Sequence, residues 1–454
     1  MADLYNRLRQ LKEERAGRGD APHGPAAGGA PARIGGAAGG SAAGGAAARP
    51  LREMPPGPGW RRVAPGVFER EQVHQLPPGI AADVWTRRAD GHRLAGGFSS
   101  PPGEALFLDV ETSGLSGGAG STAFLIGIGR LADGTFSGAS SGIGGVRVTQ
   151  LFLSEPSSEA LMLGRLHALL AEAGEFCWVT YNGGSFDLPV LRTRHILNRM
   201  QLPEHSHWDL LHITRRLWAP VIGPCNLAHV EDRVLGLSRL EDVPGSEVPG
   251  RYHRFIEDGD AASIAPVVSH HAYDVAHLAS LALVLLEVVG GMSDEHSPGL
   301  PLRARPDELA LVRLLLQRGD ERDAERCVRL LESSIAATRE RRRIADAAAR
   351  RGGFAARASA SPPRAWAQAR ELRAVLARRR GETEREHALR QELCAERGAR
   401  HDVVELAKVL EHRLKRPGEA ARLIHDWAGR VGADLSTDAE LAHRLARLQR
   451  RSPI

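Results

Sequence analysis

Two acidic side chains lie in one short apolar segment, and their spacing indicates metal chemistry. Asp109 and Glu111 both fall in the sequence LFLDVET. An apolar run of this length predicts a β-strand, in which residues two apart point to the same face. A buried face does not tolerate two carboxylates unless a positive charge lies between them. Because carboxylate oxygens suit Mg²⁺ or Mn²⁺, we predict a divalent metal site here.

Two further aspartates follow at the starts of other predicted elements. Asp187, in YNGGSFDLPVL, comes after a predicted strand at 176–181 and opens a predicted helix at 187–200. Its carboxylate is therefore expected at the C-terminal edge of that strand, although a helix N-cap is the alternative role. Asp209, in HWDLL, also opens an element, and an N-cap explains it equally well.

A third acidic position lies in a long predicted helix, from about 261 to 289. In the sequence VVSHHAYDVAHLASL, His270 and Asp274 are four residues apart and so share one helix face. The carboxylate could hold a metal ion while His270 takes a proton from the attacking water. A buried core histidine is the alternative, and the general base stays open between His270 and its neighbour His271.

These positions form one ordered set of acids. Asp109, Glu111, Asp187 and Asp274 are all expected near the ends of core strands or on a helix that packs there. Four such carboxylates can hold two cations about 3.5–4 Å apart, which contact the attacking and leaving oxygens of a phosphodiester. The set therefore predicts a metal-dependent nuclease.

The elements that must position these acids alternate between strand and helix over residues 101–290. Two apolar runs joined by a Gly-rich turn predict a β-hairpin, and the whole pattern predicts an α/β domain with a mixed sheet. We expect a Pro/Gly-rich loop at 242–254. The expected strands are 105–110, 123–129, 146–153 and 176–181, and the expected helices include 157–173, 187–200, 226–237 and 261–289.

The flanking regions have other compositions. Residues 1–50 combine a short amphipathic helix with an Ala/Gly-rich segment in which 21 of the 30 residues from 20 to 49 are Ala or Gly, so we expect disorder there. Residues 51–100 are rich in Pro and Gly, and could form edge strands or an irregular collar. Residues 301–454 show only helical patterns, which predicts stacked helical hairpins. The expected pairs are 307–318 with 320–335, 365–380 with 382–396, and 402–414 with 417–429.

Charge and composition suggest partners and location. Residues 301–454 contain 34 Lys/Arg against 23 Asp/Glu, an excess of 11 positive charges. The whole chain has a net charge of only +5. A basic half favours nucleic acid as partner, and solvated Arg-rich helices are the equal alternative. The four cysteines are widely scattered, no secretory signal pattern is present, and no apolar run reaches membrane-spanning length. We therefore expect a cytoplasmic chain without a membrane partner.

At these motifs the chain resembles a known family. LFLDVETSGLSGGAGSTAFLIGIG, YNGGSFDLPVL and SHHAYDVAHLASL resemble motifs of the bacterial YprB-type ribonuclease H-like proteins, a branch of the DEDD 3′–5′ exonuclease superfamily. The resemblance implies a ribonuclease H-like fold and a 3′–5′ exonuclease that uses two Mg²⁺ or Mn²⁺ ions on DNA or RNA. It also implies Asp109 and Glu111 as the first motif, Asp187 as the second and Asp274 as the third, all metal ligands.

The same resemblance extends to the C-terminal region but does not identify the general base. Similar proteins carry helical repeats after the nuclease domain, and VVELAKVLEHRLKRPGEAARLIHDWA resembles a tetratricopeptide repeat, which could bind a protein partner. Histidine-type DEDD enzymes place the base at the position of Ser269, and tyrosine-type enzymes place it at the position of His270. The alternative function is therefore a scaffold for nucleic acid or protein with little turnover.

Overall fold

A computed structural model describes residues 54–88, 92, 103–114, 120–132, 144–237, 243–290, 302–318 and 364–451, with a few residues between 328 and 340. The helix and disordered segment predicted over residues 1–50 lie outside the described residues. Most of the helix predicted at 320–335 also lies outside the described residues.

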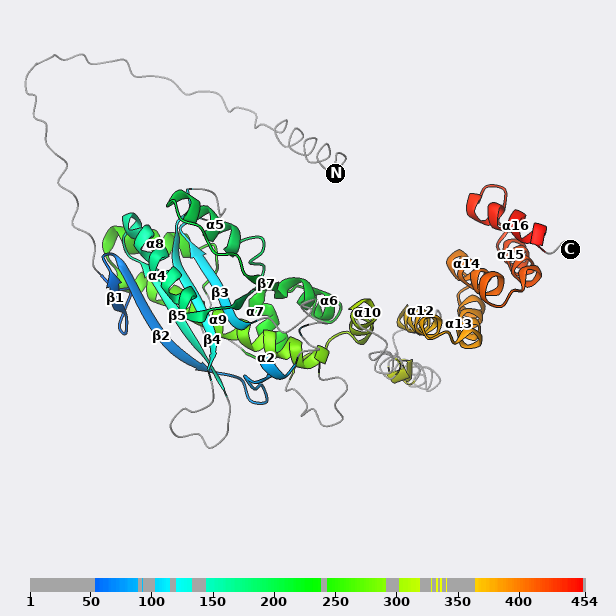
Figure 1. Cartoon of the computed structure of the whole chain (residues 1–454), viewed down its shortest axis with the longest axis horizontal. Helices are drawn as coiled ribbons and strands as arrows, with labels where there is room; N and C mark the ends of the chain where they lie inside the picture. The colour runs from blue at the N-terminus through cyan, green and yellow to red at the C-terminus, as the bar shows by residue number, and fades with distance from the viewer. Residues whose placement is uncertain are drawn as a thin grey trace, which may run out of the picture. The chain divides into compact units, whose positions relative to one another are not determined.

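One mixed sheet forms the centre of the α/β region (Figure 1). Its seven strands follow the order β1-β2-β5-β4-β3-β6-β7. The β3–β6 and β6–β7 pairs are parallel and the others are antiparallel, so the predicted mixed sheet is confirmed. The strands are β1 (Arg61–Ala64), β2 (Val67–Gln75), β3 (Glu104–Thr112), β4 (Ala123–Ala132), β5 (Gly145–Leu153), β6 (Phe176–Thr180) and β7 (Ser206–Asp209).

The predicted hairpin is the β3–β4 pair, and it places the two acids of β3. Asp109 lies opposite Gly127, and Glu111 lies opposite Leu125. The residues of β3 alternate between two separate hydrophobic clusters: Leu108 packs on one side of the sheet and Phe107 on the other. Because side chains two apart share a face, Asp109 and Glu111 lie on the same side as Phe107.

Helices cover both faces of this sheet. Helices α4, α5 and α8 pack on the Leu108 face, while α6 and most of α9 pack on the Phe107 face. The helical elements of the region are α2 (Val84–Arg87), η2 (Pro156–Ser158), α4 (Glu159–Ala173), α5 (Asp187–Leu197), α6 (Leu210–Ile222), α7 (Leu227–Val230), η3 (Glu231–Leu235), α8 (Val248–Asp258) and α9 (Ala261–Gly290).

Two glycines of β4 let α9 lie close to the sheet. A Cβ atom on Gly127 would stand 2.5 Å from Cε1 of His271, and one on Gly129 would stand 2.8 Å from Cγ1 of Val275. Any larger residue at these positions would force the side chain of His271 or Val275 to move away from the sheet. This close packing fixes the register between α9 and the strands that carry the acids.

Helix α9 corrects one expectation about membranes. By length and composition it could cross a membrane, contrary to the prediction that no segment was long enough. Its most apolar window is 89% buried inside the protein, which is the pattern of a core helix.

Helix α8 corrects the loop predicted at 242–254. Its buried residues Val248, Tyr252 and Phe255 follow helical spacing, and Pro249 lies in the first turn, where the missing amide hydrogen has no cost. The Pro and Gly residues obscured this periodicity in the sequence. Strand β7 was also not predicted as a strand.

Over 51–100, where edge strands or an irregular collar were the alternatives, the structure has two strands of the main sheet. Strand β1 is the edge strand, and β2 lies between β1 and β5, paired with β5 from Val67 to Gln75. The α/β unit therefore begins near residue 61 rather than near residue 101.

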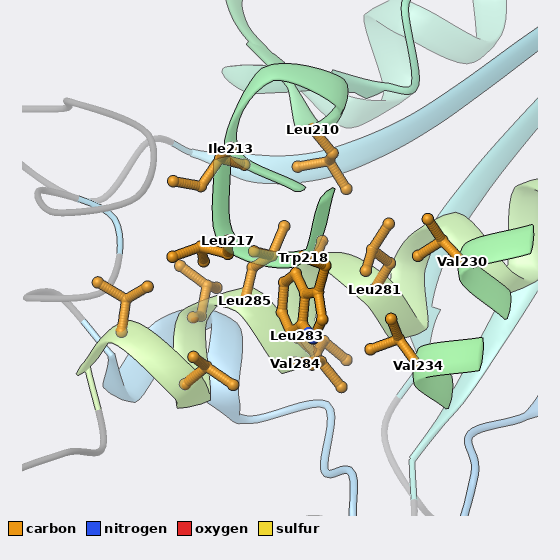
Figure 2. Close-up of a cluster of buried hydrophobic side chains, with 14 of the residues drawn as sticks. Leu210, Ile213, Leu217, Trp218, Val230, Val234, Leu281, Leu283, Val284 and Leu285 are labelled. Carbon is orange, nitrogen blue, oxygen red and sulfur yellow. The ribbon is translucent and has the colours of Figure 1, made fainter. Parts of the chain in front are cut away.

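A large apolar cluster joins α6 to the C-terminal half of α9 (Figure 2). Trp218 of α6 is fully enclosed, with Leu281 and Leu285 of α9 and Val234 of η3 in the same cluster. The indole Nε1 of Trp218 donates to the carbonyl of Ala304 at 3.0 Å. Leucines of α10 (Glu308–Arg318) belong to the same cluster, so the first C-terminal helix is part of this core.

The rest of the described C-terminal region is entirely helical, as predicted. Residues such as Leu410, Ile424 and Leu441 form a separate apolar core between α14, η6, α15 and α16. Helix α16 lies beyond the last predicted pair. The elements are α12 (Arg364–Arg379), α13 (Thr383–Glu396), α14 (Arg400–Lys408), η6 (Val409–Arg413), α15 (Pro417–Val431) and α16 (Ala439–Arg451).

Candidate metal centre

Three of the four predicted acids meet where β3 and α9 cross. One carboxylate oxygen from each of Asp109, Glu111 and Asp274 lies within 4.8 Å of the others. Asp109 keeps 30% of its side chain exposed, whereas Asp274 is buried. The group is therefore reachable from solvent on one side, as a site for an ion and a substrate must be.

Asp187 lies beside this group rather than within it. It is the first residue of α5 and is only 3% exposed, and its Oδ1 atom has no hydrogen-bond partner among the described residues. Its negative charge raises the pKa of Glu111, which shows that the two carboxylates are electrostatically close. A buried carboxylate oxygen without a donor is costly, and a cation ligand is one explanation for it.

The pKa values of the site show how crowded these negative charges are. Burial, with the charges of Asp274 and Asp187 adding to it, raises the pKa of Glu111 to about 8. Burial also raises the pKa of Asp187 to about 7, although backbone hydrogen bonds from its own amide and that of Val110 oppose the shift. A divalent cation would favour the ionised forms, so the donor set fits such an ion.

Asp209 holds the loop that presents Asp187. Its Oδ1 accepts hydrogen bonds from the amides of Asn182 at 2.8 Å and Leu211 at 3.0 Å, and its Oδ2 accepts one from the amide of Gly184 at 3.1 Å. The N-cap role on α6 is thereby confirmed. The same carboxylate also stabilises Asn182, whose φ of 68° lies in the left-handed region. Asp209 therefore fixes the turn between β6 and α5.

The two adjacent histidines of α9 point in different directions. His270 Nε2 lies 3.1 Å from Oδ2 of Asp274, at the acidic group. His271 is fully buried between α9 and the sheet, with Nε2 3.1 Å from the carbonyl oxygen of Asp109. Burial lowers the pKa of His271 to about 3, so its ring is neutral at physiological pH.

The sequence did not identify Gln150 as a residue of the site, and it left open whether His277 belongs to it. Gln150 of β5 bonds to Nδ1 of His271 at 2.9 Å. Its only signal was a long polar side chain within the apolar run VTQLFL. His277, which lies on the same helix one turn after Asp274, pairs instead with the buried Glu231 at 3.3 Å.

Comparisons with known proteins agree with this geometry. Residues 106–286 match the family model of the RNase H superfamily. The chain is also 36% identical over 219 residues to the uncharacterized protein YprB of Bacillus subtilis (strain 168), a match that covers 47% of this chain and 49% of the relative. The chain therefore carries an RNase H-like domain, while it spans about half the length of the curated relative that it matches. Strands β1 and β2 precede the residues matched by the family model.

Proposed function

We propose that the protein is a divalent-metal-dependent nuclease that hydrolyses phosphodiester bonds of DNA or RNA as a DEDD-type 3′–5′ exonuclease. The observation that carries the proposal is the convergence of Asp109, Glu111 and Asp274 within 4.8 Å of one another, inside an RNase H-like fold. Asp187, buried beside them with an oxygen that no described residue hydrogen-bonds, completes the set of four acids.

These four carboxylates would hold two Mg²⁺ or Mn²⁺ ions. When bound, such ions stabilise the negative charge on the attacking and leaving oxygens of a phosphodiester. The acids come from three different elements, since β3 carries Asp109 and Glu111, α5 carries Asp187 and α9 carries Asp274. The fold therefore fixes their separation more firmly than a single loop could.

His270 is the proposed general base. It would take a proton from the attacking water, and Asp274 Oδ2 at 3.1 Å would stabilise the resulting imidazolium. His271 is unsuited to this role because both of its ring nitrogens are engaged in buried hydrogen bonds. The geometry therefore favours His270 over His271, the choice that the sequence left open.

The C-terminal helices would supply the partner contacts, and one observation favours protein over nucleic acid there. Glu411, fully buried, contacts Arg444, Arg447 and Arg451 of α16. These internal contacts engage part of the basic excess, so fewer arginines remain for phosphate groups. A scaffold that binds a protein partner through its tetratricopeptide-like helices is accordingly the second candidate function. We also propose the cytoplasmic location that the sequence predicts.

A cleavage assay tests the main proposal. Purified full-length protein is incubated with Mg²⁺ or Mn²⁺ and with single- and double-stranded DNA and RNA, each labelled in turn at the 5′ and 3′ ends. We expect 5′-labelled strands to shorten progressively and 3′-labelled strands to release the label at once. Absence of cleavage on every substrate at saturating metal would refute the nuclease, and internal cuts would refute the exonuclease.

A further inference from the structure

A chain of hydrogen bonds, fully buried at its centre, crosses the sheet and ends at Asp109 of the candidate metal centre. The guanidinium of Arg70 on β2 donates to Oε1 of Gln150 on β5 at 2.8 Å. Nε2 of Gln150 bonds to Nδ1 of His271 at 2.9 Å, and Nε2 of His271 bonds to the carbonyl oxygen of Asp109 at 3.1 Å. The relay Arg70–Gln150–His271–Asp109 thus links β2, β5, α9 and β3.

The strand register places the relay in one row across the sheet. Arg70 lies opposite Gln150, Gln150 opposite Gly127, and Gly127 opposite Asp109. Gly127 leaves an empty space above β4, which the ring of His271 fills. Gln150 on β5 is therefore linked to Asp109 on β3 through His271, although Gly127 of the intervening strand β4 has no side chain.

The hydrogen bonds of the relay permit one arrangement of protons. Gln150 uses its two amide hydrogens on the carbonyl of Val268, at 2.9 Å, and on Nδ1 of His271, because its oxygen already accepts from Arg70. Nδ1 of His271 is therefore an acceptor, and Nε2–H donates to the carbonyl of Asp109. The polar atoms of Gln150 and His271 thus each have one defined role in the relay.

We propose that Gln150 and His271 are positioning residues of the metal centre, and that β2 belongs to the functional unit through Arg70. His271 adjoins His270 on α9 and bonds to the backbone of Asp109, so its position sets the distance between the two acid-bearing elements. Hydrogen-bonded groups behind metal ligands typically change metal affinity about 10–100-fold when they are removed. For its effect on cleavage, the inference rests on the proposed nuclease function, while its effect on metal binding does not.

The outer end of the relay is held as well. The guanidinium of Arg70 lies over the ring of Trp60, 5.0 Å from its centroid. Trp60 and Arg70 both precede the residues matched by the family model. Strand β2 would therefore have a role beyond the edge of the sheet, because its Arg70 would orient Gln150, which in turn positions His271.

The test measures Mn²⁺ affinity of the full-length protein by isothermal titration, together with circular dichroism to confirm folding. Gln150→Leu keeps the volume but removes the bonds to His271, and we expect affinity to fall about 10–100-fold. Arg70→Met should weaken binding several-fold, and Arg70→Lys, which can still donate to Gln150, should recover part of the loss. His195→Gln is the matched control, because His195 is an equally buried histidine whose Nδ1 bonds to Leu191 in α5.

The outcomes are distinct. A loss of affinity in Gln150→Leu and Arg70→Met, with none in His195→Gln, supports the positioning role. Unchanged affinity in folded Gln150→Leu overturns it, and if that variant does not fold, unchanged affinity in Arg70→Met does so. A wild-type protein that binds Mn²⁺ but cleaves nothing refutes the nuclease and leaves this inference standing, whereas a wild-type protein that binds no Mn²⁺ refutes both.

Discussion

Two regions of the molecule bury carboxylates, but the pKa values of these carboxylates shift in opposite directions. Around Glu111 on β3 the neighbours that shift its pKa are other acids, and burial with their charges raises that pKa to about 8. Around Glu411 burial acts in the same direction, but hydrogen bonding to Arg447 and the nearby positive charges of His412 and Arg444 outweigh it and lower the pKa. Arginines therefore compensate the charge of Glu411, whereas the charges that act on Glu111 are those of other acids.

This difference separates a structural charge cluster from a group of acids that could bind a cation. A buried ion pair satisfies its own charges and needs nothing from solvent. Crowded acids instead store repulsion that a divalent cation can relieve, and such perturbed groups are typical of functional sites. The following predictions test this contrast, starting with the largest expected effect.

Removing one acid of the metal group should abolish metal-dependent cleavage. We expect Asp109→Ala and Asp187→Ala to lose all divalent-dependent hydrolysis in the end-label assay. The metal-free variants should fold, and should unfold at the same or a higher temperature, because like-charge repulsion is relieved. Glu71→Gln is the control, since Glu71 is exposed on β2 and pairs with Arg147. Cleavage that persists in both alanine variants would remove the metal-site assignment.

Removing the proposed base should slow the reaction without weakening metal binding. His270→Ala should lower the rate at saturating metal by about 10²–10⁴-fold, the usual contribution of a positioned base. Mn²⁺ affinity should change little, in contrast to the variants of the relay. A greater loss of rate in His271→Ala at saturating metal would mean that the base has been assigned to the wrong histidine.

Removing the acid of the C-terminal cluster should affect stability alone. Glu411→Gln leaves three arginines of α16 close together without their carboxylate, so we expect a loss of about 3 kcal/mol in the unfolding free energy of this region. Urea unfolding measures this effect, and cleavage of a short substrate should be unchanged. A variant as stable as the wild type would show that this cluster does not stabilise the region.

The two regions should also respond oppositely to pH. Glu111 has a raised pKa in the folded, metal-free protein, so the folded state binds more protons and stability falls as pH rises from about 4.5 to about 8. The lowered pKa of Glu411 means that its stabilisation is lost as pH falls into the acidic range. Thermal unfolding from about pH 2 to about pH 9 should show both trends, because the loss at Glu411 falls below its ordinary pKa of 4.5, and Glu111→Gln should flatten only the first. Added Mg²⁺ should also flatten it, and a slope that is unaffected by either change would argue against strain at Glu111.

The smallest effect should come from removing the outer helices. Because α10 packs into the core around Trp218, the deletion should begin at residue 364 and leave residues 302–318 in place. If these helices contact nucleic acid, KM for long strands should rise while the rate on a short substrate at saturation stays the same. If the full-length protein binds a labelled strand no better than the truncated protein does at low salt, these helices contact protein rather than phosphate.

Much of the site could be predicted because its local geometry is written within a few residues. The period of a strand alone places Asp109 and Glu111 on one face, and the period of a helix places His270 beside Asp274. Strong apolar patterns likewise gave β3, β4, β5 and α9. Where Pro and Gly interrupted the pattern, as in α8, the local signal misled.

What only the tertiary structure decided is how these local pieces meet. Nothing in the spacing of β3 and α9 says that Gly127 and Gly129 permit the close approach that brings Asp274 to Asp109 and Glu111. Nor does it say that His271 points inward to Gln150 while its neighbour faces the acids. Backbone periodicity acts over a few residues, whereas the register between distant segments depends on how their side chains pack. The sequence therefore determined the chemistry available to this protein, and the packing of α9 on the sheet determined where that chemistry is assembled.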